Sequence, residues 1–341
     1  MMIMINLFAR CLFMKPRPLN LQHHLYLRRS HRSTFMHKQK TYYRHKILRR
    51  TFVRGLTMVG LNKPKWPKAP TCWIDNKILY ISIPFTWNLP DVKSMLMQRS
   101  LFWNHAVVGG PAIGLMPDFI DLEWVSIEQN YHEALKKVNP MATKTTVGCI
   151  RKCNFCAVSQ IEGGFRELAD WDDKPILIDN NLLAASQKHF DKVIDRLIKW
   201  KWADFNQGLD SRLLTDYHAE RLKQIKKPMI RLALDDISYQ DQWSTAFEKL
   251  RRAGIAKTNI RSYALLGFRT GPDEGWKRCE WIESHGIKVL PMWFHKLDTL
   301  KQHQVTDQQK HLGWTDIERK RVMQWYYQHN EKYGRSKYRE C

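Results

Sequence analysis

The sequence has little cysteine and no long apolar run. Seven of its 341 residues are cysteine, too few and too scattered for the disulfide framework of a small secreted protein. No stretch of about 18 consecutive apolar residues occurs, so the sequence predicts no transmembrane helix. Hydrophobic residues make up 43% and aromatic residues 12%, which is enough to bury a core and excludes an intrinsically disordered protein. We expect a soluble protein in a reducing, cytoplasmic compartment.

Acidic residues are missing from the first part of the chain. The formal net charge is +23, and residues 1–70 hold sixteen Lys and Arg before the first carboxylate, Asp75. Three interpretations fit such a segment: a nucleic-acid-binding arm, an acid-poor transit peptide, or a translation start placed too early. Met36 and Met58 offer later starts. We favour a start at Met58, which leaves residues 1–57 as a mis-started or disordered extension, ahead of the binding arm.

Three of the seven cysteines, Cys149, Cys153 and Cys156, lie within eight positions in the segment GCIRKCNFCAV. A structural zinc site takes four protein ligands, and no second CxxC pair is present to supply them. Three thiolates leave one coordination position open, which suits a four-iron cluster with one iron free for another ligand. A zinc site completed by one of the fourteen histidines is the alternative.

The CxxxCxxC spacing, with Phe155 directly before the last cysteine, resembles the cluster motif of the radical S-adenosylmethionine (SAM) superfamily. The resemblance covers roughly residues 143–298. It implies a [4Fe-4S] cluster bound by Cys149, Cys153 and Cys156, with SAM on the free iron and reductive cleavage of SAM to a 5′-deoxyadenosyl radical. It also implies an electron donor such as flavodoxin or ferredoxin as a partner.

Strand-like and helix-like segments alternate around and after the cysteines. Six such repeats can be counted from the strand before Cys149, a pattern typical of a parallel sheet with right-handed crossovers. Six repeats are too few for the usual eight-stranded barrel, so we expect an open partial (β/α)6 TIM-like barrel over residues 141–300. Residues 301–341 are expected to contain a C-terminal helix that packs on the barrel, with nucleic-acid binding by its basic and aromatic residues as the alternative.

A small α/β unit is expected before the barrel, over residues 70–140. KILYISIPF alternates as a strand does, a segment with helical spacing follows, and HAVVGGPAIG combines a strand with a glycine turn. This order resembles a reduced cobalamin-binding-like domain of one radical SAM branch. The DxHxxG segment that would supply an axial histidine to cobalt is missing from the sequence, so we do not expect bound cobalamin.

Polar residues follow five of the expected strands, at the ends where parallel α/β folds bind their ligands. Each residue alone fits an ordinary turn or helix cap, but the repeated placement favours a binding rim. Together with Phe155, the residues expected to contact the cofactor are Asp179, Asn180, Asn181, Asn206, Gln207, Asp210, Arg212, Asp235, Asp236, Trp293 and His295.

The family usually carries GGE after its second strand, where this sequence has IDNN. Acidic forms of this kind resemble the methylthiotransferase-like and cobalamin-domain-like branches. Those branches include RNA modifiers, so a nucleic acid base is our first expectation for the substrate, and no catalytic residue is predicted. The rival hypothesis is a non-catalytic zinc- or cluster-stabilised module that binds nucleic acid.

Overall fold

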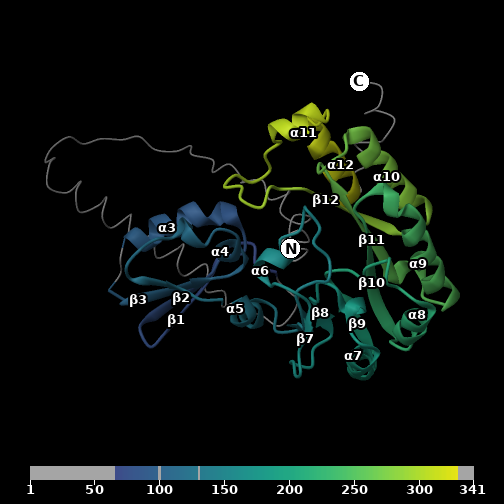
Figure 1. Ribbon diagram of the computed structural model, residues 1–341, viewed down its shortest axis with the longest axis horizontal. Coiled ribbons are helices and arrows are strands. Elements are labelled where there is room, and N and C mark those ends of the chain that lie inside the picture. The colour runs from purple at the N-terminus through teal and green to yellow at the C-terminus, as the bar shows by residue number, and fades with distance from the viewer. Residues whose placement is uncertain (1–65, 99–100, 130, 329–341) are drawn as a thin grey trace, which may run out of the picture. The chain divides into compact units, whose positions relative to one another are not determined.

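The computed structural model describes residues 66–98, 101–129 and 131–328 (Figure 1). The expectations for residues 1–57, and for the chain after residue 328, lie outside these ranges. Within them the protein is a mixed α/β structure with a four-stranded sheet, a six-stranded sheet and a two-stranded pairing. None of the described helices is both long enough and apolar enough to span a membrane.

The four-stranded sheet has the order β1-β2-β3-β4. Its strands are β1 (Thr71–Asp75), β2 (Ile78–Ser82), β3 (His105–Gly109) and β4 (Val125–Ile127). β1 and β2 form an antiparallel hairpin, joined by Asn76 and Lys77, which both have positive φ as a tight hairpin turn requires. β2, β3 and β4 are parallel. The sequence predicted β2 and β3, whereas it did not reveal β1 and β4.

Three helices accompany this sheet: α3 (Leu89–Met97), α4 (Pro111–Leu115) and α5 (Tyr131–Val138). Apolar side chains of α3 and of the two central strands are buried together, because their spacing places them on one helix face and on one side of the sheet. This core consists mainly of Leu79, Ile81, Leu89, Val92, Leu96, Ala106 and Val108.

The six-stranded sheet has the order β12-β11-β10-β9-β8-β5, and all its pairings are parallel. Its strands are β5 (Ala142–Thr143), β8 (Ile176–Leu177), β9 (Trp202–Phe205), β10 (Lys227–Leu234), β11 (Ile260–Leu266) and β12 (Lys288–Trp293). In the described part of the chain, β5 and β12 are its two edges. Parallel strands joined by helices place all carboxyl ends at one rim of the sheet.

Helices connect the later strands, and Figure 1 shows α8, α9 and α10 along one face of the sheet. They are α7 (Gln187–Trp200), α8 (Asp216–Lys223), α9 (Gln240–Arg252) and α10 (Pro272–Ser284). Thr215 caps α8, since its side chain accepts a hydrogen bond from the His218 N–H at the start of the helix. Two further helices follow β12, namely α11 (Asp307–His311) and α12 (Asp316–Gln328).

The strand expected directly before Cys149 is split in the structure. β5 joins the large sheet, whereas β6 (Thr146–Val147) leaves it and pairs antiparallel with β7 (Arg166–Glu167). At this break the buried Asp179 carboxylate accepts hydrogen bonds from the backbone N–H groups of Thr145 and Thr146. These N–H groups are therefore not available to a neighbouring strand.

Candidate functional site

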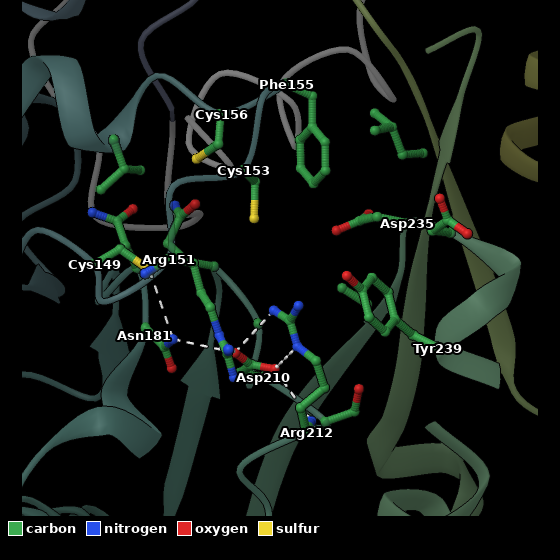
Figure 2. A pocket seen from close by; sticks show the side chains of 18 of the residues that line it. Cys149, Arg151, Cys153, Phe155, Cys156, Asn181, Asp210, Arg212, Asp235 and Tyr239 are labelled. Atoms are coloured by element: carbon green, nitrogen blue, oxygen red, sulfur yellow. Dashed lines mark hydrogen bonds and ion pairs between the residues drawn. The ribbon is translucent and has the colours of Figure 1, made fainter. Parts of the chain in front are cut away.

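The three clustered cysteines lie on the loop after β6 and line one cavity of about 430 Å³. Figure 2 shows Cys153 and Cys156 on one stretch of this loop, with Phe155 beside them. The loop is tightly turned, because the Cys156 N–H donates to the Cys153 carbonyl at 2.9 Å. The N–H of Arg151 points at Cys149 Sγ, 3.3 Å away, an arrangement that stabilises a thiolate.

The start of this loop requires a glycine. Gly148 has a φ of +77°, and a Cβ at this position would collide with the backbone of Gly164. Its N–H donates to Glu162 Oε2 at 2.8 Å. The backbone of the EGG segment therefore packs directly against Gly148, at the start of the cysteine loop.

A buried ion pair stabilises the start of the cysteine loop. The Lys144 and Glu162 side chains are 1% and 9% exposed and form a salt bridge. Asn180 Nδ2 also donates to Glu162 Oε2, at 2.8 Å. Burial alone would raise the pKa of Glu162, but the Lys144 ammonium and the Gly148 N–H outweigh it and hold the pKa below its ordinary value. Glu162 thus ties the cysteine loop to the end of β8.

A carboxylate network borders Cys149 on the other side. Asp210 accepts from Arg151 Nε at 3.2 Å and from Arg212 Nε at 2.7 Å. Asn181 Nδ2 lies 3.3 Å from Asp210 Oδ2 and 3.7 Å from Cys149 Sγ. Burial would raise the pKa of Asp210, yet the two guanidinium groups keep it lowered. These contacts hold the Arg151 and Arg212 guanidinium groups and the Asn181 amide in one network next to Cys149.

The opposite wall of the cavity has groups without partners. Figure 2 shows Asp235 and Tyr239 across the cavity from Cys149 and Asn181. Asp235 Oδ1 is shut off from solvent and has no hydrogen-bond partner among the described residues; burial raises the pKa of this carboxyl to about 6. Both polar atoms of the Gln207 side chain are likewise buried and unpartnered within that part of the chain. Such groups cost free energy unless a ligand satisfies them.

Most of the residues predicted from the sequence meet at this cavity. Those that line it are Cys149, Cys153, Phe155, Cys156, Asn180, Asn181, Gln207, Asp210, Arg212, Asp235 and Asp236. They come from the cysteine loop and from the carboxyl ends of β8, β9 and β10.

Asp179 does not line the cavity. Its Oδ1 accepts hydrogen bonds from the backbone and hydroxyl groups of both Thr145 and Thr146, and burial outweighs these contacts and raises its pKa. Asn206 also lies elsewhere, and its carbonyl accepts from the Tyr263 hydroxyl at 2.7 Å. Neither residue is among those that line the cavity.

Trp293 and His295 also lie outside the cavity. The Trp293 ring packs edge-to-face on Trp314 at 4.9 Å, on the side of β12 opposite to Met292, which lines the cavity. His295 packs against Trp87 at 5.4 Å, and its burial lowers the pKa of the imidazole to about 3. Successive residues of a strand point to opposite faces of the sheet. The end of a strand can therefore be located from the sequence while the residue expected to face the cavity is in fact on the other face.

Sequence reasoning missed several cavity residues. They are Arg151, Lys152, Ser211, Tyr239, Phe268, Arg269 and Met292, among others. Phe268 and Arg269 follow β11, whose end is not marked by the Asp and Asn residues found after the other strands. The alternation of β12 could have identified Met292, whereas nothing local in the sequence indicates Tyr239.

The thiol groups that line this cavity belong to the three cysteines. Burial raises the pKa of Cys153 and of Cys156, so a bound metal must displace their protons. In the ranges described, no three His, Cys, Asp or Glu side chains stand close enough together for one ion. The three cysteines that line this cavity supply three thiol groups, the number that a cubane cluster with one free iron would take.

Comparison of the sequence with known family models finds no matching model, and comparison with curated proteins finds no matching relative. The function is therefore argued from the residues of the site and from their chemistry.

Proposed function

We propose that this protein is a radical SAM enzyme with one [4Fe-4S] cluster bound by Cys149, Cys153 and Cys156. One observation carries the proposal: the three cysteines of a CxxxCxxC segment line a single cavity that is also lined by polar residues at the carboxyl ends of parallel strands. Ligand sites of parallel α/β folds lie at this rim. Three thiolates, as opposed to four, leave one iron available for SAM.

The residues around Cys149 are suited to hold the amino acid part of SAM. Asn180 and Asn181 bring amide groups to the cavity, and Arg151 and Arg212 bring cations that Asp210 keeps in place. An ammonium and a carboxylate can each find a partner of opposite charge or a hydrogen-bond partner here. When bound, the cluster supplies the electron that cleaves the sulfonium of SAM to a 5′-deoxyadenosyl radical.

The proposal includes an open partial barrel formed by the six-stranded sheet and its helices. Six parallel strands with open edges at β5 and β12 are compatible with an open partial (β/α)6 barrel. A barrel left open on one side admits a larger substrate than a closed one does. An electron donor of the flavodoxin or ferredoxin type, and a cytoplasmic setting in which thiolates stay reduced, complete the proposal.

The zinc-module alternative has less support. It requires a fourth ligand beside the cysteines, and among the described residues that line the cavity there is no histidine. His189 has other contacts, since its ring faces Thr145 and Glu167.

Anaerobic reconstitution of the purified protein tests the proposal. We expect binding of iron and sulfide, a broad brown absorbance, and release of 5′-deoxyadenosine from SAM after addition of dithionite. Metal analysis of the protein as isolated runs in parallel. One tightly held zinc per chain, with no iron uptake and no 5′-deoxyadenosine, would establish the zinc module instead.

A further inference from the structure

One of the three clustered thiols, Cys149, has two N–H groups directed at its sulfur. The backbone N–H of Arg151 donates to Cys149 Sγ at 3.3 Å, and the side-chain amide of Asn181 donates to the same atom at 3.7 Å. Figure 2 shows the Asn181 side chain between Cys149 and Asp210. Any residue other than proline at position 151 keeps the backbone donor, so the Asn181 amide is the contact that a substitution can remove.

The surroundings of Asn181 fix the orientation of its amide. The residue is 2% exposed, and its Nδ2 also donates to Asp210 Oδ2 at 3.3 Å. A carboxamide nitrogen carries two hydrogens, one for each of these acceptors. The flipped amide would turn its oxygen towards the Asp210 carboxylate and repel it, so the hydrogen-bond network assigns the nitrogen to the side of the cysteine.

The carboxylate that orients this amide is itself held in place. Asp210 accepts from Arg151 Nε at 3.2 Å and from Arg212 Nε at 2.7 Å. Burial opposes the ionisation of Asp210, but the two guanidinium groups keep its pKa below the ordinary value. An ionised carboxylate only accepts hydrogen bonds, so the Asn181 amide keeps its nitrogen towards both Asp210 and Cys149.

Hydrogen bonds to the sulfur ligands are among the features that set the reduction potential of an iron–sulfur cluster. Reduction adds an electron, and part of the added negative charge lies on the thiolate sulfurs. An N–H group directed at such a sulfur interacts more strongly with the reduced form, because hydrogen bonds to charged acceptors are the stronger ones. A contact of this kind therefore favours reduction.

We propose that Asn181 raises the reduction potential of the cluster bound by the three cysteines, through the hydrogen bond from its amide to the Cys149 sulfur. The inference rests on the proposed function, since it needs a cluster at these cysteines. It gives Asn181 a role separate from the binding of SAM: with this amide in place, an electron donor of low potential reduces the cluster more readily.

A redox titration of the anaerobically reconstituted protein, monitored by the EPR signal of the reduced cluster, tests the inference. SAM is left out, because its cleavage would consume the electron. Asn181→Leu keeps the branched shape of the side chain and removes the N–H donor. We expect the variant to bind as much iron as the wild type and to shift the reduction equilibrium about tenfold towards the oxidised cluster, a fall of about 59 mV for a one-electron couple.

Gln207→Met is the control variant. Gln207 is 1% exposed and lines the same cavity, but neither polar atom of its side chain has a hydrogen-bond partner in the described structure. The substitution therefore removes a buried amide that does not contact a cysteine, and we expect the potential of the wild type. An equal fall in both variants would assign the effect to the loss of any polar group and would overturn the proposal.

The outcomes separate this inference from the proposed function. A wild type that takes up no iron contradicts both, whereas full iron content with an unchanged potential in Asn181→Leu contradicts only the role of Asn181. Asn181→Ala also lacks the donor and is measured in parallel, in case the Leu side chain hinders cluster assembly. Loss of iron in both variants would mean that the amide is needed to build the site, and would overturn a role in setting its potential.

Discussion

A buried pair of opposite charges lies next to the start of the cysteine loop. Removing two charged groups from water costs more free energy than removing two neutral groups. Lys144 and Glu162 are both buried, and Glu162 also accepts from the Gly148 N–H and from Asn180. Replacing a whole buried ion pair by apolar groups is often neutral, whereas removing one partner leaves an uncompensated charge. The pair therefore fixes the position of the loop more than it adds to the net stability of the fold.

We predict that Glu162→Gln lowers the free energy of unfolding by about 3–5 kcal/mol. The double variant Lys144→Met with Glu162→Gln should recover most of this loss, because no unpaired charge remains. Urea denaturation of the wild type, both single variants and the double variant measures the coupling. A single-variant loss that the double variant does not reduce would contradict the assigned role of the pair.

The same pair predicts a pH dependence. The pKa of Glu162 in the folded protein is lowered from its ordinary value of 4.5, so its contribution to stability is present above about pH 4.5 and is lost as the pH falls through the lower, folded-state pKa. We expect the unfolding free energy of the wild type to fall more steeply with acid in this range than that of the double variant. Equal slopes in urea titrations between pH 5 and pH 3 would contradict the lowered pKa.

Two glycines with nearly the same backbone angle test the packing of the cysteine loop. Gly148 and Gly163 have φ values of +77° and +75°, but only at Gly148 would a Cβ collide with backbone, and at Gly163 it would meet nothing within 4 Å. Gly163→Ala should cost about 1–2 kcal/mol, the strain of a left-handed residue. Gly148→Ala should cost more and should also reduce iron uptake. Similar thermal stability and iron content in the two variants would contradict the close packing of Gly148 against the Gly164 backbone.

At the scale of elements, the sequence predicted the long helices and strands well, because periodic burial determines them. β10, β11, α7 and α9 have seven or more residues each, long enough for such a period to show in the sequence. β5 and β8 have two residues each, too few to show a period. The division of the first strand into β5 and β6 depends on Asp179, about 35 residues further along the chain, and no local pattern reveals a contact at that separation.

α12 permits a test of the two interpretations of the C-terminal segment. Val322, Met323 and Tyr326 are buried, and the Tyr327 hydroxyl donates to the Pro291 carbonyl of β12 at 2.6 Å. The helix is thus packed on the sheet, and its aromatic residues on this face are not available for stacking on bases.

We predict that Val322→Ala lowers the unfolding free energy by about 2 kcal/mol, because it removes buried methyl groups from a filled space. Lys320→Ala, on the exposed side of the same helix, should change it by less than about 0.5 kcal/mol. Thermal denaturation of both variants measures this difference. A larger loss in Lys320→Ala than in Val322→Ala would mean that α12 does not pack through this face.

For the whole molecule, the candidate site is made of segments that the topology brings together. Residues from the cysteine loop to β12 line one cavity because parallel strands end at one rim. The sequence marked the three cysteines and the polar residues after the strands. It did not distinguish which neighbour of each pair faces the cavity: Gln207 and Met292 line it, whereas Asn206 and Trp293 do not. Which of two neighbouring residues faces the cavity depends on the twist of the strand and on the residue at which it ends. Both are determined only when the whole sheet has formed.

The most direct measurement compares iron content and 5′-deoxyadenosine release in three anaerobically reconstituted proteins: the wild type, Cys153→Ala and Cys279→Ala. Cys279 is a fully buried residue of α10, so its variant controls for the general effect of losing a thiol. We predict about four irons per chain and 5′-deoxyadenosine release for the wild type and Cys279→Ala, and the loss of both for Cys153→Ala, since in the proposed site each cysteine of the loop would bind one iron of a single cluster. Iron loss in Cys279→Ala as severe as in Cys153→Ala, or full iron content in Cys153→Ala, would contradict the assignment.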